Sequence, residues 1–87
     1  AGVDALTVGL SKELGPEGVR VNAVAPGLVD TDMHAAMGAP DRVRRMAPGI
    51  PLRRAGRAEE IAAAIAWLLS PDASYTTGAV LRVAGGR

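Results

Sequence analysis

Two short apolar segments on either side of one helical segment limit the fold of this 87-residue chain more than any other feature. The first covers residues 19–25 and ends at Pro26-Gly27; the second covers residues 79–83 and stops at Gly85-Gly86. Short runs that are rich in β-branched residues and bounded by Gly and Pro are typical of strands. Beyond Asn22 the first segment is nearly all apolar, which predicts a strand buried on both faces.

The helix between these strands is predicted over residues 59–69. Ile61, Ile65 and Leu68 recur at helical spacing, and acidic residues in the first turn suit the helix dipole. Ser70-Pro71 ends the helix, because Pro restricts the residue before it. A strand, a helix and a strand in this order form a right-handed crossover, so we expect the two strands to be parallel neighbours.

A second helix is predicted over residues 2–14. Leu6, Leu10 and Leu14 lie on one helical face together with Val3, and Gly15-Pro16 ends the pattern. Residues 26–57 are rich in Pro and Gly, with short helices expected at 32–37 and 41–46. A connection of this length inside a compact unit is usually functional or mobile.

The fold class is therefore α/β, in the order helix, strand, long loop, helix, strand. Two parallel strands alone do not make a stable sheet, so a segment outside these residues should pair with one edge. The chain begins with Ala1 rather than Met and enters helical periodicity almost at once. We therefore expect it to be part of a larger protein.

The composition excludes several classes of function. The formal net charge is +1, which selects neither nucleic acid nor an anionic membrane as a partner. The chain has no Cys, which excludes disulfides, thiolate catalysis and sulfur-ligated zinc, and we expect no metal site. No apolar run approaches the roughly 18–20 residues that span a bilayer, so no membrane association is expected.

The strand end at Pro26-Gly27 is the most informative candidate site. In an open α/β sheet, ligands bind outside the carboxyl ends of the strands. Gly27 would let the backbone approach a ligand closely, and the backbone groups of Leu28 and Val29 would be available for hydrogen bonds. The alternative interpretation is an ordinary turn that ends a strand.

Four segments taken together resemble the short-chain dehydrogenase/reductase family, in its order and at its spacing. They are residues 10–14, residues 19–31, residues 51–54 with 59–62, and residues 67–70 continued through Thr77-Gly78 to Gly85-Gly86. The resemblance runs over nearly the whole chain. It implies that residues 1–87 are the C-terminal portion of one NAD(P)-binding domain, with a Rossmann-type doubly wound parallel sheet, in a cytoplasmic oxidoreductase. Ala84 departs from the family, which usually has Asp there, and Arg57-Ala58 replaces a common acid-Pro pair.

The resemblance also implies roles for particular residues. The cofactor-binding residues would be Pro26, Gly27, Leu28, Val29 and Thr31, with the Val29 backbone on the nicotinamide carboxamide and the Thr31 hydroxyl on the carboxamide or a diphosphate oxygen. Residues 32–57 would form a substrate lid over a small alcohol or carbonyl compound. The lid residues proposed to face that substrate are Met33, His34 and Met37.

The residues that carry out catalysis in this family are absent. The only Lys is Lys12, with Val8 four residues before it, and the only Tyr is Tyr75, with Ala79 four residues after it, so no Tyr-x-x-x-Lys pair exists. No Gly-rich phosphate loop opens a helix either. The resemblance places these motifs before Ala1, and we expect the isolated chain to be inactive.

Two questions stay open at this stage. The residues that choose between NAD and NADP lie in the missing half of the family's domain. The chain would belong to a homo-oligomer, a dimer or a tetramer, because in this family its first helix packs in one interface and its last helix and strand in another. The alternative function is accordingly a non-catalytic oligomerisation or binding piece.

Other polar residues have simpler explanations. A lone His such as His34 is usually only solvated, and Asp32 fits the first turn of a short helix better than a catalytic pair with Asp30. Glu59 and Glu60 are interpreted as compensation of the helix dipole. A basic cluster is interpreted as a solvated face, or for a few members as a contact to a cofactor phosphate: Arg42, Arg44, Arg45, Arg53, Arg54 and Arg57.

Overall fold

The computed structural model describes residues 2–30 and 42–87. Its helices and strands are, in chain order, α1 (Gly2–Leu14), β1 (Ala23–Pro26), β2 (Val29–Asp30), α3 (Arg42–Met46), β3 (Gly56–Arg57), α4 (Ala58–Leu69) and β4 (Val80–Val83). Single 3-10 turns follow three of the helices, at Gly15–Glu17, Ala47–Gly49 and Pro71–Ala73. The predicted helices at 2–14, 41–46 and 59–69 are confirmed to within a residue, whereas the one expected at 32–37 lies outside the described residues.

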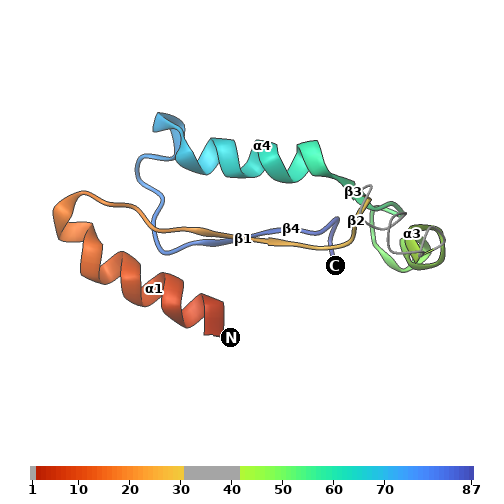
Figure 1. Cartoon of the computed structure of the whole chain (residues 1–87), viewed down its shortest axis with the longest axis horizontal. Coiled ribbons are helices and arrows are strands. Elements are labelled where there is room, and N and C mark those ends of the chain that lie inside the picture. The colour runs from red at the N-terminus through yellow and green to blue at the C-terminus, as the bar shows by residue number, and fades with distance from the viewer. Residues whose placement is uncertain (1, 31–41) are drawn as a thin grey trace.

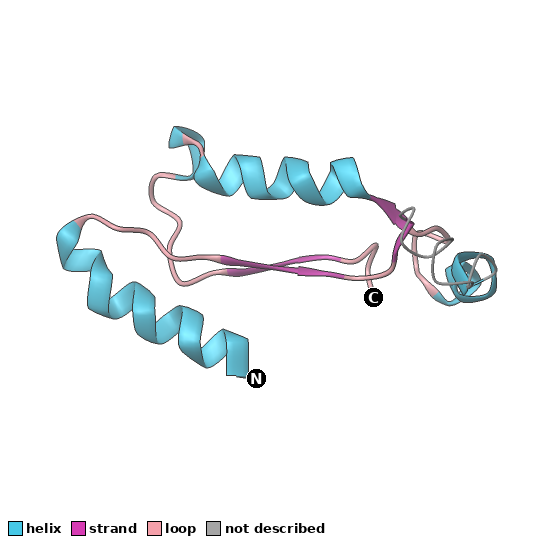
Figure 2. Ribbon diagram, viewed as in Figure 1, coloured by secondary structure: helices cyan, strands magenta, loops and turns pink. Residues whose placement is uncertain are grey.

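A parallel pair of strands, β1 and β4, forms the centre of the molecule. The register pairs Ala23 with Val80 and Pro26 with Val83. Helix α4 lies along one side of this pair and α1 along the other, which gives three layers (Figures 1 and 2). The predicted α/β order and the predicted parallel neighbours are therefore confirmed, with α4 as the crossover.

Strand β1 is shorter than the sequence predicts. It begins at Ala23 rather than at residue 19, and it includes Pro26. The reason is that β4 begins only at Val80, so residues 21 and 22 meet the turn before β4 instead of a strand. Side chains replace part of the ladder there: the Val21 N–H donates to Thr77 Oγ1 at 3.0 Å, and Asn22 Oδ1 accepts from the Ala79 N–H at 3.0 Å.

The burial expected on both faces of the first strand is wrong within this chain. Residues 23–25 are only half-buried, and Pro26 is exposed. A sheet of two strands covers one edge of β1 and leaves the other without a strand among the described residues. The completely covered side chains lie elsewhere, at Ile50 and Ala73.

Helix α1 fully buries only two small polar side chains, whereas its leucines are half-buried or exposed. Thr7 and Ser11 are buried, whereas Val3 and Leu6 are each 62% exposed. Both hydroxyls are satisfied within the helix, Thr7 Oγ1 on the Val3 carbonyl and Ser11 Oγ on the Val8 carbonyl, each at 2.7 Å, so that burying them costs little. Small side chains allow the helix to approach closely, and the N-terminal part of the apolar stripe, Val3 and Leu6, is left facing outward.

Two features are absent from the residues that the structure describes. Within residues 2–30 and 42–87, no helix has the length and apolar character that crossing a membrane requires. In the same part of the chain, no group of three metal-binding side chains comes together.

Candidate functional site

The segment Pro26–Val29 leaves the carboxyl end of β1 and runs along the end of β4. The Gly27 N–H donates to the Val83 carbonyl at 3.1 Å, which extends the ladder one residue beyond β1. At Gly27 a Cβ atom would lie 2.7 Å from Ala84 Cβ and 2.9 Å from Ala84 Cα. Gly27 is therefore required by close backbone packing against the end of β4.

A second parallel pair, β2 with β3, holds the other side of this segment. Val29 pairs with Gly56 and Asp30 with Arg57. The Gly56 N–H donates to the Leu28 carbonyl at 2.9 Å. Because backbone groups along a strand alternate between its two edges, the ladder uses residues 28 and 30, and the N–H and carbonyl of Val29 face the edge away from β3.

Gly85 and Gly86, which follow β4, pack against the turn at residues 50–52. Gly85 and Gly86 have φ angles of 67° and 98°, which favour Gly. The Gly85 carbonyl accepts a hydrogen bond from the Leu52 N–H at 3.0 Å, and the buried Ile50 lies against Gly85. The turn at residues 50–52 is thereby fixed beside the end of β4.

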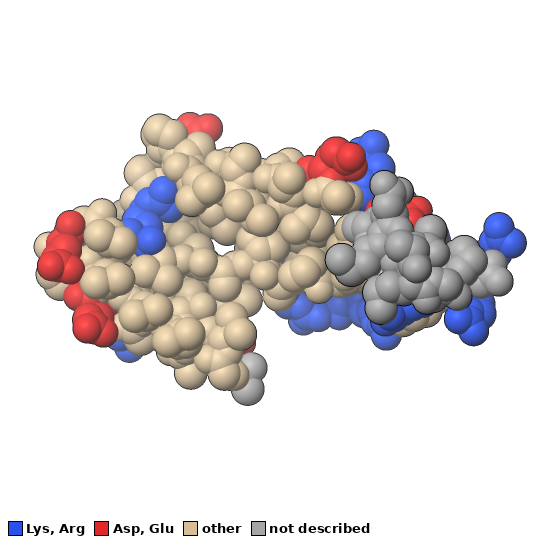
Figure 3. All heavy atoms as spheres, in the orientation of Figure 1, with Lys and Arg blue, Asp and Glu red and all other residues tan. Residues whose placement is uncertain are grey.

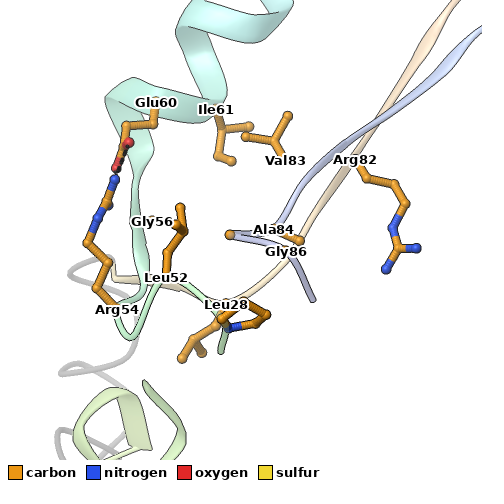
Figure 4. Close-up of a pocket in the computed structure, with 12 residues that line it drawn as sticks. Leu28, Leu52, Arg54, Gly56, Glu60, Ile61, Arg82, Val83, Ala84 and Gly86 are labelled. Carbon is orange, nitrogen blue, oxygen red and sulfur yellow. Dashed lines mark hydrogen bonds and ion pairs between the residues drawn. The ribbon is translucent and has the colours of Figure 1, made fainter. Parts of the chain in front are cut away.

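These elements line a cavity of about 450 Å³ that is partly open to solvent. Its lining includes Leu28 and Gly56 from the β2–β3 pair, Ile61 of α4, and Ala84 after β4 (Figure 4). The figure shows the side chains of Ile61 and Val83 turned toward one another, and Arg54 and Glu60 joined along one wall. The cavity is therefore mainly apolar, with one ion pair at its edge.

The carboxylate of Glu60 contacts two arginines at the edge of this cavity. Arg54 donates to both carboxylate oxygens, from Nη1 at 2.7 Å and from Nη2 at 2.9 Å. The Arg57 backbone N–H donates to Oε1 at 3.0 Å, and Arg57 Nε lies 3.5 Å from the same oxygen. Hydrogen bonds from Arg54 and from the Arg57 backbone lower the pKa of Glu60 to about 2, and the bond to Glu60 raises the pKa of Arg54.

The remaining arginines of residues 42–57 are exposed, as the sequence predicts for a solvated face. Two of them contact groups nearby in the chain: within α3, Arg42 Nε lies 3.4 Å from Met46 Sδ, and Arg53 donates to the Pro48 carbonyl. Basic side chains gather near the α3 end of the molecule in the face that Figure 3 shows. Among the described residues, only Arg54 and Arg57 form ion pairs, both with Glu60.

The structure brings four of the predicted cofactor-binding residues together in one segment, Pro26–Val29. Gly27, Leu28 and Val29 are half-buried, and Pro26 is exposed. The Leu28 carbonyl accepts a hydrogen bond from the Gly56 N–H and therefore faces β3. The N–H and the carbonyl of Val29, the next residue, both face the opposite edge of β2. Thr31, Met33, His34 and Met37 lie outside the described residues, as do Asp32 and the first part of the expected lid.

Sequence reasoning missed Gly56 and the role of Glu60. Glu60 does more than compensate the helix dipole, because it ties the turn before α4 to the helix. A signal for this was present: Glu at the third position of a helix reaches back to the backbone N–H of the residue that precedes the helix.

Comparisons with known proteins identify the family of the chain. The family model described as enoyl-(acyl carrier protein) reductase matches residues 1–87. An uncharacterized oxidoreductase, YgfF of Escherichia coli K12, is 53% identical over 98% of the chain. A 3-oxoacyl-[acyl-carrier protein] reductase from Brucella melitensis superposes over 98% of the chain with a TM-score of 0.88 and 39% identity. An NADPH-bound short-chain oxidoreductase from Pseudomonas aeruginosa PAO1 covers the same share with a TM-score of 0.83 and 38% identity.

The chain spans about a third of the length of these relatives. It covers 34% of the Escherichia coli oxidoreductase, 31% of the Brucella reductase and 35% of the Pseudomonas oxidoreductase.

Proposed function

Because this chain belongs to the short-chain dehydrogenase/reductase family, we propose that its Pro26–Val29 segment forms the nicotinamide side of an NAD(P)-binding site in an oxidoreductase. One observation carries the proposal. The segment emerges at the carboxyl end of a parallel strand, and Val29 turns its N–H and carbonyl away from β3. Ligands of open α/β sheets bind at such strand ends.

The residues present fit the nicotinamide group. A carboxamide carries both a hydrogen-bond donor and an acceptor, and the Val29 backbone offers one of each on the same edge. Gly27 lets the segment pack directly against Ala84, which fixes the backbone two residues before Val29. When bound, the nicotinamide ring would give or take a hydride; the protein segment holds and orients its carboxamide.

In this proposal the 87 residues form the C-terminal portion of one NAD(P)-binding domain, and residues 32–57 form its substrate lid. The phosphate-binding loop and the catalytic Ser, Tyr and Lys come from an upstream segment. We call the polypeptide that contains both parts the parent protein. It reduces a carbonyl compound or oxidises the corresponding alcohol, and 3-oxoacyl thioesters are the first substrates to test because the Brucella relative is named for one.

We also propose that the parent protein is a homo-oligomer. The outward stripe of α1 supports this, because Val3 and Leu6 are each 62% exposed in the described structure. A second copy is the partner that would cover such a stripe in a dimer or tetramer.

Thr31→Val in the parent protein tests the site. We expect the mutation to raise the dissociation constant of NADH or NADPH about 2- to 10-fold, because it removes one hydrogen bond with a net worth of about 0.5–1.5 kcal/mol. Calorimetric titration measures this. Thr77→Val is the matched control, since the Thr77 hydroxyl bonds to the Val21 N–H away from the segment.

An unchanged dissociation constant for both cofactors in Thr31→Val would remove Thr31 from the site. Absence of any cofactor binding by the parent protein would favour the alternative, a non-catalytic oligomerisation or binding piece. The isolated 87-residue chain should show no turnover with either cofactor, because it contains no Tyr-x-x-x-Lys pair and no phosphate loop.

A further inference from the structure

Glu60 joins three parts of the wall beside the cofactor segment. Its two carboxylate oxygens accept both Nη groups of Arg54, at 2.7 and 2.9 Å, and the Arg57 backbone N–H at 3.0 Å. Glu60 itself belongs to the first turn of α4. The carboxylate therefore closes the turn at residues 54–57 onto the start of a twelve-residue helix.

Gly56 lies between the two arginines that Glu60 holds. Its N–H donates to the Leu28 carbonyl at 2.9 Å, and it is the register partner of Val29. A two-residue ladder has few hydrogen bonds of its own, so its geometry depends on what fixes each strand. Strand β3 is held by Glu60, which accepts a hydrogen bond from the Arg57 backbone N–H.

The energetics of this ion pair favour a role in geometry over a role in stability. The side chains of Arg54 and Glu60 are 52% and 30% exposed. Exposed ion pairs contribute little to folding, because water screens the charges and both side chains lose conformational freedom. A bidentate Arg–carboxylate contact nevertheless fixes the relative orientation of its two partners, because both groups are planar.

We propose that Glu60 is a positioning residue for the cofactor segment: through Arg54, Arg57 and Gly56 it sets the place of the Leu28–Val29 backbone. This inference rests on the proposed function, because it assigns a consequence to that same segment. Glu60 touches no reacting atom in this scheme. It acts through the β2–β3 ladder.

The matched control is Glu59, the neighbouring acid in the same helical turn. Among the described residues Glu59 forms no ion pair, so Glu59→Ala removes an equal charge from the same helix end without freeing Arg54. Any effect through the helix dipole or the net charge should be the same in both variants. A difference between them reports the contacts of Glu60.

The experiment compares Glu60→Ala, Glu60→Gln and Glu59→Ala in the parent protein. For Glu60→Ala we expect the dissociation constant of the nicotinamide cofactor to rise about three- to tenfold, with kcat at saturating cofactor within about twofold of wild type. Glu60→Gln should fall between, because an amide oxygen still accepts the Arg57 N–H. Glu59→Ala should bind cofactor as wild type does. Equal affinities in Glu60→Ala and Glu59→Ala would overturn the proposal.

Amide hydrogen exchange at Gly56 gives a readout that does not depend on cofactor. Glu60→Ala should accelerate exchange of the Gly56 N–H at least severalfold relative to Glu59→Ala, while amides within β1 and β4 keep wild-type rates. If the wild-type parent protein binds no nicotinamide cofactor, the proposed function fails and the Gly56 rate alone decides whether Glu60 positions the ladder. An unchanged Gly56 rate would refute the positioning role in either case.

Discussion

Gly27 occupies a position with no room for a side chain, because the backbone of residue 84 lies directly opposite. A Cβ atom there would lie 2.7 Å from Ala84 Cβ. Ala84 Cβ is attached directly to the backbone, so it cannot move aside as the end of a long side chain could. We expect Gly27→Ala to destabilise the parent protein by about 1–3 kcal/mol, as overpacking does, and to weaken cofactor binding. Urea unfolding and cofactor titration measure the two effects.

Gly15→Ala is the control for this substitution. A Cβ atom at Gly15 would meet nothing within 4 Å, and its free energy of unfolding should stay within about 0.5 kcal/mol of wild type. Equal stabilities for the two variants would mean that the end of β4 can shift away from Gly27 without cost.

The contribution of Glu60 to stability, which is small because the exposed ion pair is screened by water, should depend on pH. Its pKa in the folded protein is about 2, against an ordinary value of 4.5, because Arg54 and the Arg57 backbone stabilise the charged form. A lowered pKa means that the contribution is complete above about pH 4.5 and is lost as the pH falls toward 2. The difference in Tm between wild type and Glu60→Gln should therefore be largest near neutral pH and should vanish near pH 2. A Tm difference that stays constant from pH 7 to pH 2 would contradict this prediction.

At the level of single residues, the sequence predicts the candidate segment better than the contacts around it. Pro26-Gly27 predicts a strand end, and ligands of parallel sheets bind at such ends, so the pattern indicates Gly27–Val29 as a candidate segment, and its role in binding stays a proposal. The bidentate contact of Arg54 with Glu60 could not be predicted in this way. This contact depends on a turn in which Arg53 has a φ of 60°. No residue type in that turn predicts a left-handed conformation.

At the level of elements, Asn22 joins the beginnings of β1 and β4. Its Nδ2 donates to the Thr76 carbonyl at 2.9 Å, and its Oδ1 accepts from the Ala79 N–H at 3.0 Å. We expect Asn22→Ala to lower the free energy of unfolding of the parent protein by about 1–3 kcal/mol, because it leaves a partly buried backbone N–H without its partner. Chemical denaturation measures the change.

Thr77→Val serves as the comparison at the same junction. The Thr77 hydroxyl accepts from the Val21 N–H at an exposed position, where water can replace it, so a loss below about 1 kcal/mol is expected. If the two variants lose equal stability, Asn22 is not the residue that holds the two strands in register.

The larger elements follow from periodicity, and the small ones do not. Helices α1 and α4 and the parallel pair β1–β4 are predicted by apolar spacing and by the handedness of the crossover. The β2–β3 pair has two residues in each strand, which is too short for any alternation to show. The packing of α1 could not be predicted either, since its fully buried side chains are Thr7 and Ser11, whereas Leu6 is exposed and Leu10 and Leu14 are only half-buried.

At the level of the whole molecule, the chain exposes more surface than its size requires. A folded protein of 8.9 kDa has a surface of about 4,800 Å² and a radius of gyration of about 12 Å. This chain has 6160 Å² and 15.5 Å, with principal extents of 47, 26 and 25 Å. The difference in area exceeds the roughly 800 Å² that one partner buries in a standard interface.

Much of this exposed surface consists of apolar side chains on the helices and of a strand edge without a partner. Val3 and Leu6 of α1 are each 62% exposed, Leu69 at the end of α4 is 77% exposed, and β1 has a strand partner on only one edge among the described residues. An apolar edge strand with unpaired backbone groups is a template for association. Both kinds of surface favour contact with further polypeptide over contact with water.

We therefore expect the isolated 87-residue chain to self-associate at micromolar concentration or to lack stable tertiary structure. Sedimentation velocity, combined with amide exchange on the same sample, separates these two forms. Val3→Glu with Leu6→Glu should reduce any association that proceeds through the α1 stripe, because it places two like charges on that stripe. A monodisperse monomer in which the amides of Ala23–Pro26 and Val80–Val83 are strongly protected would contradict the expectation, since it would show that two strands and two helices bury enough surface to hold the fold.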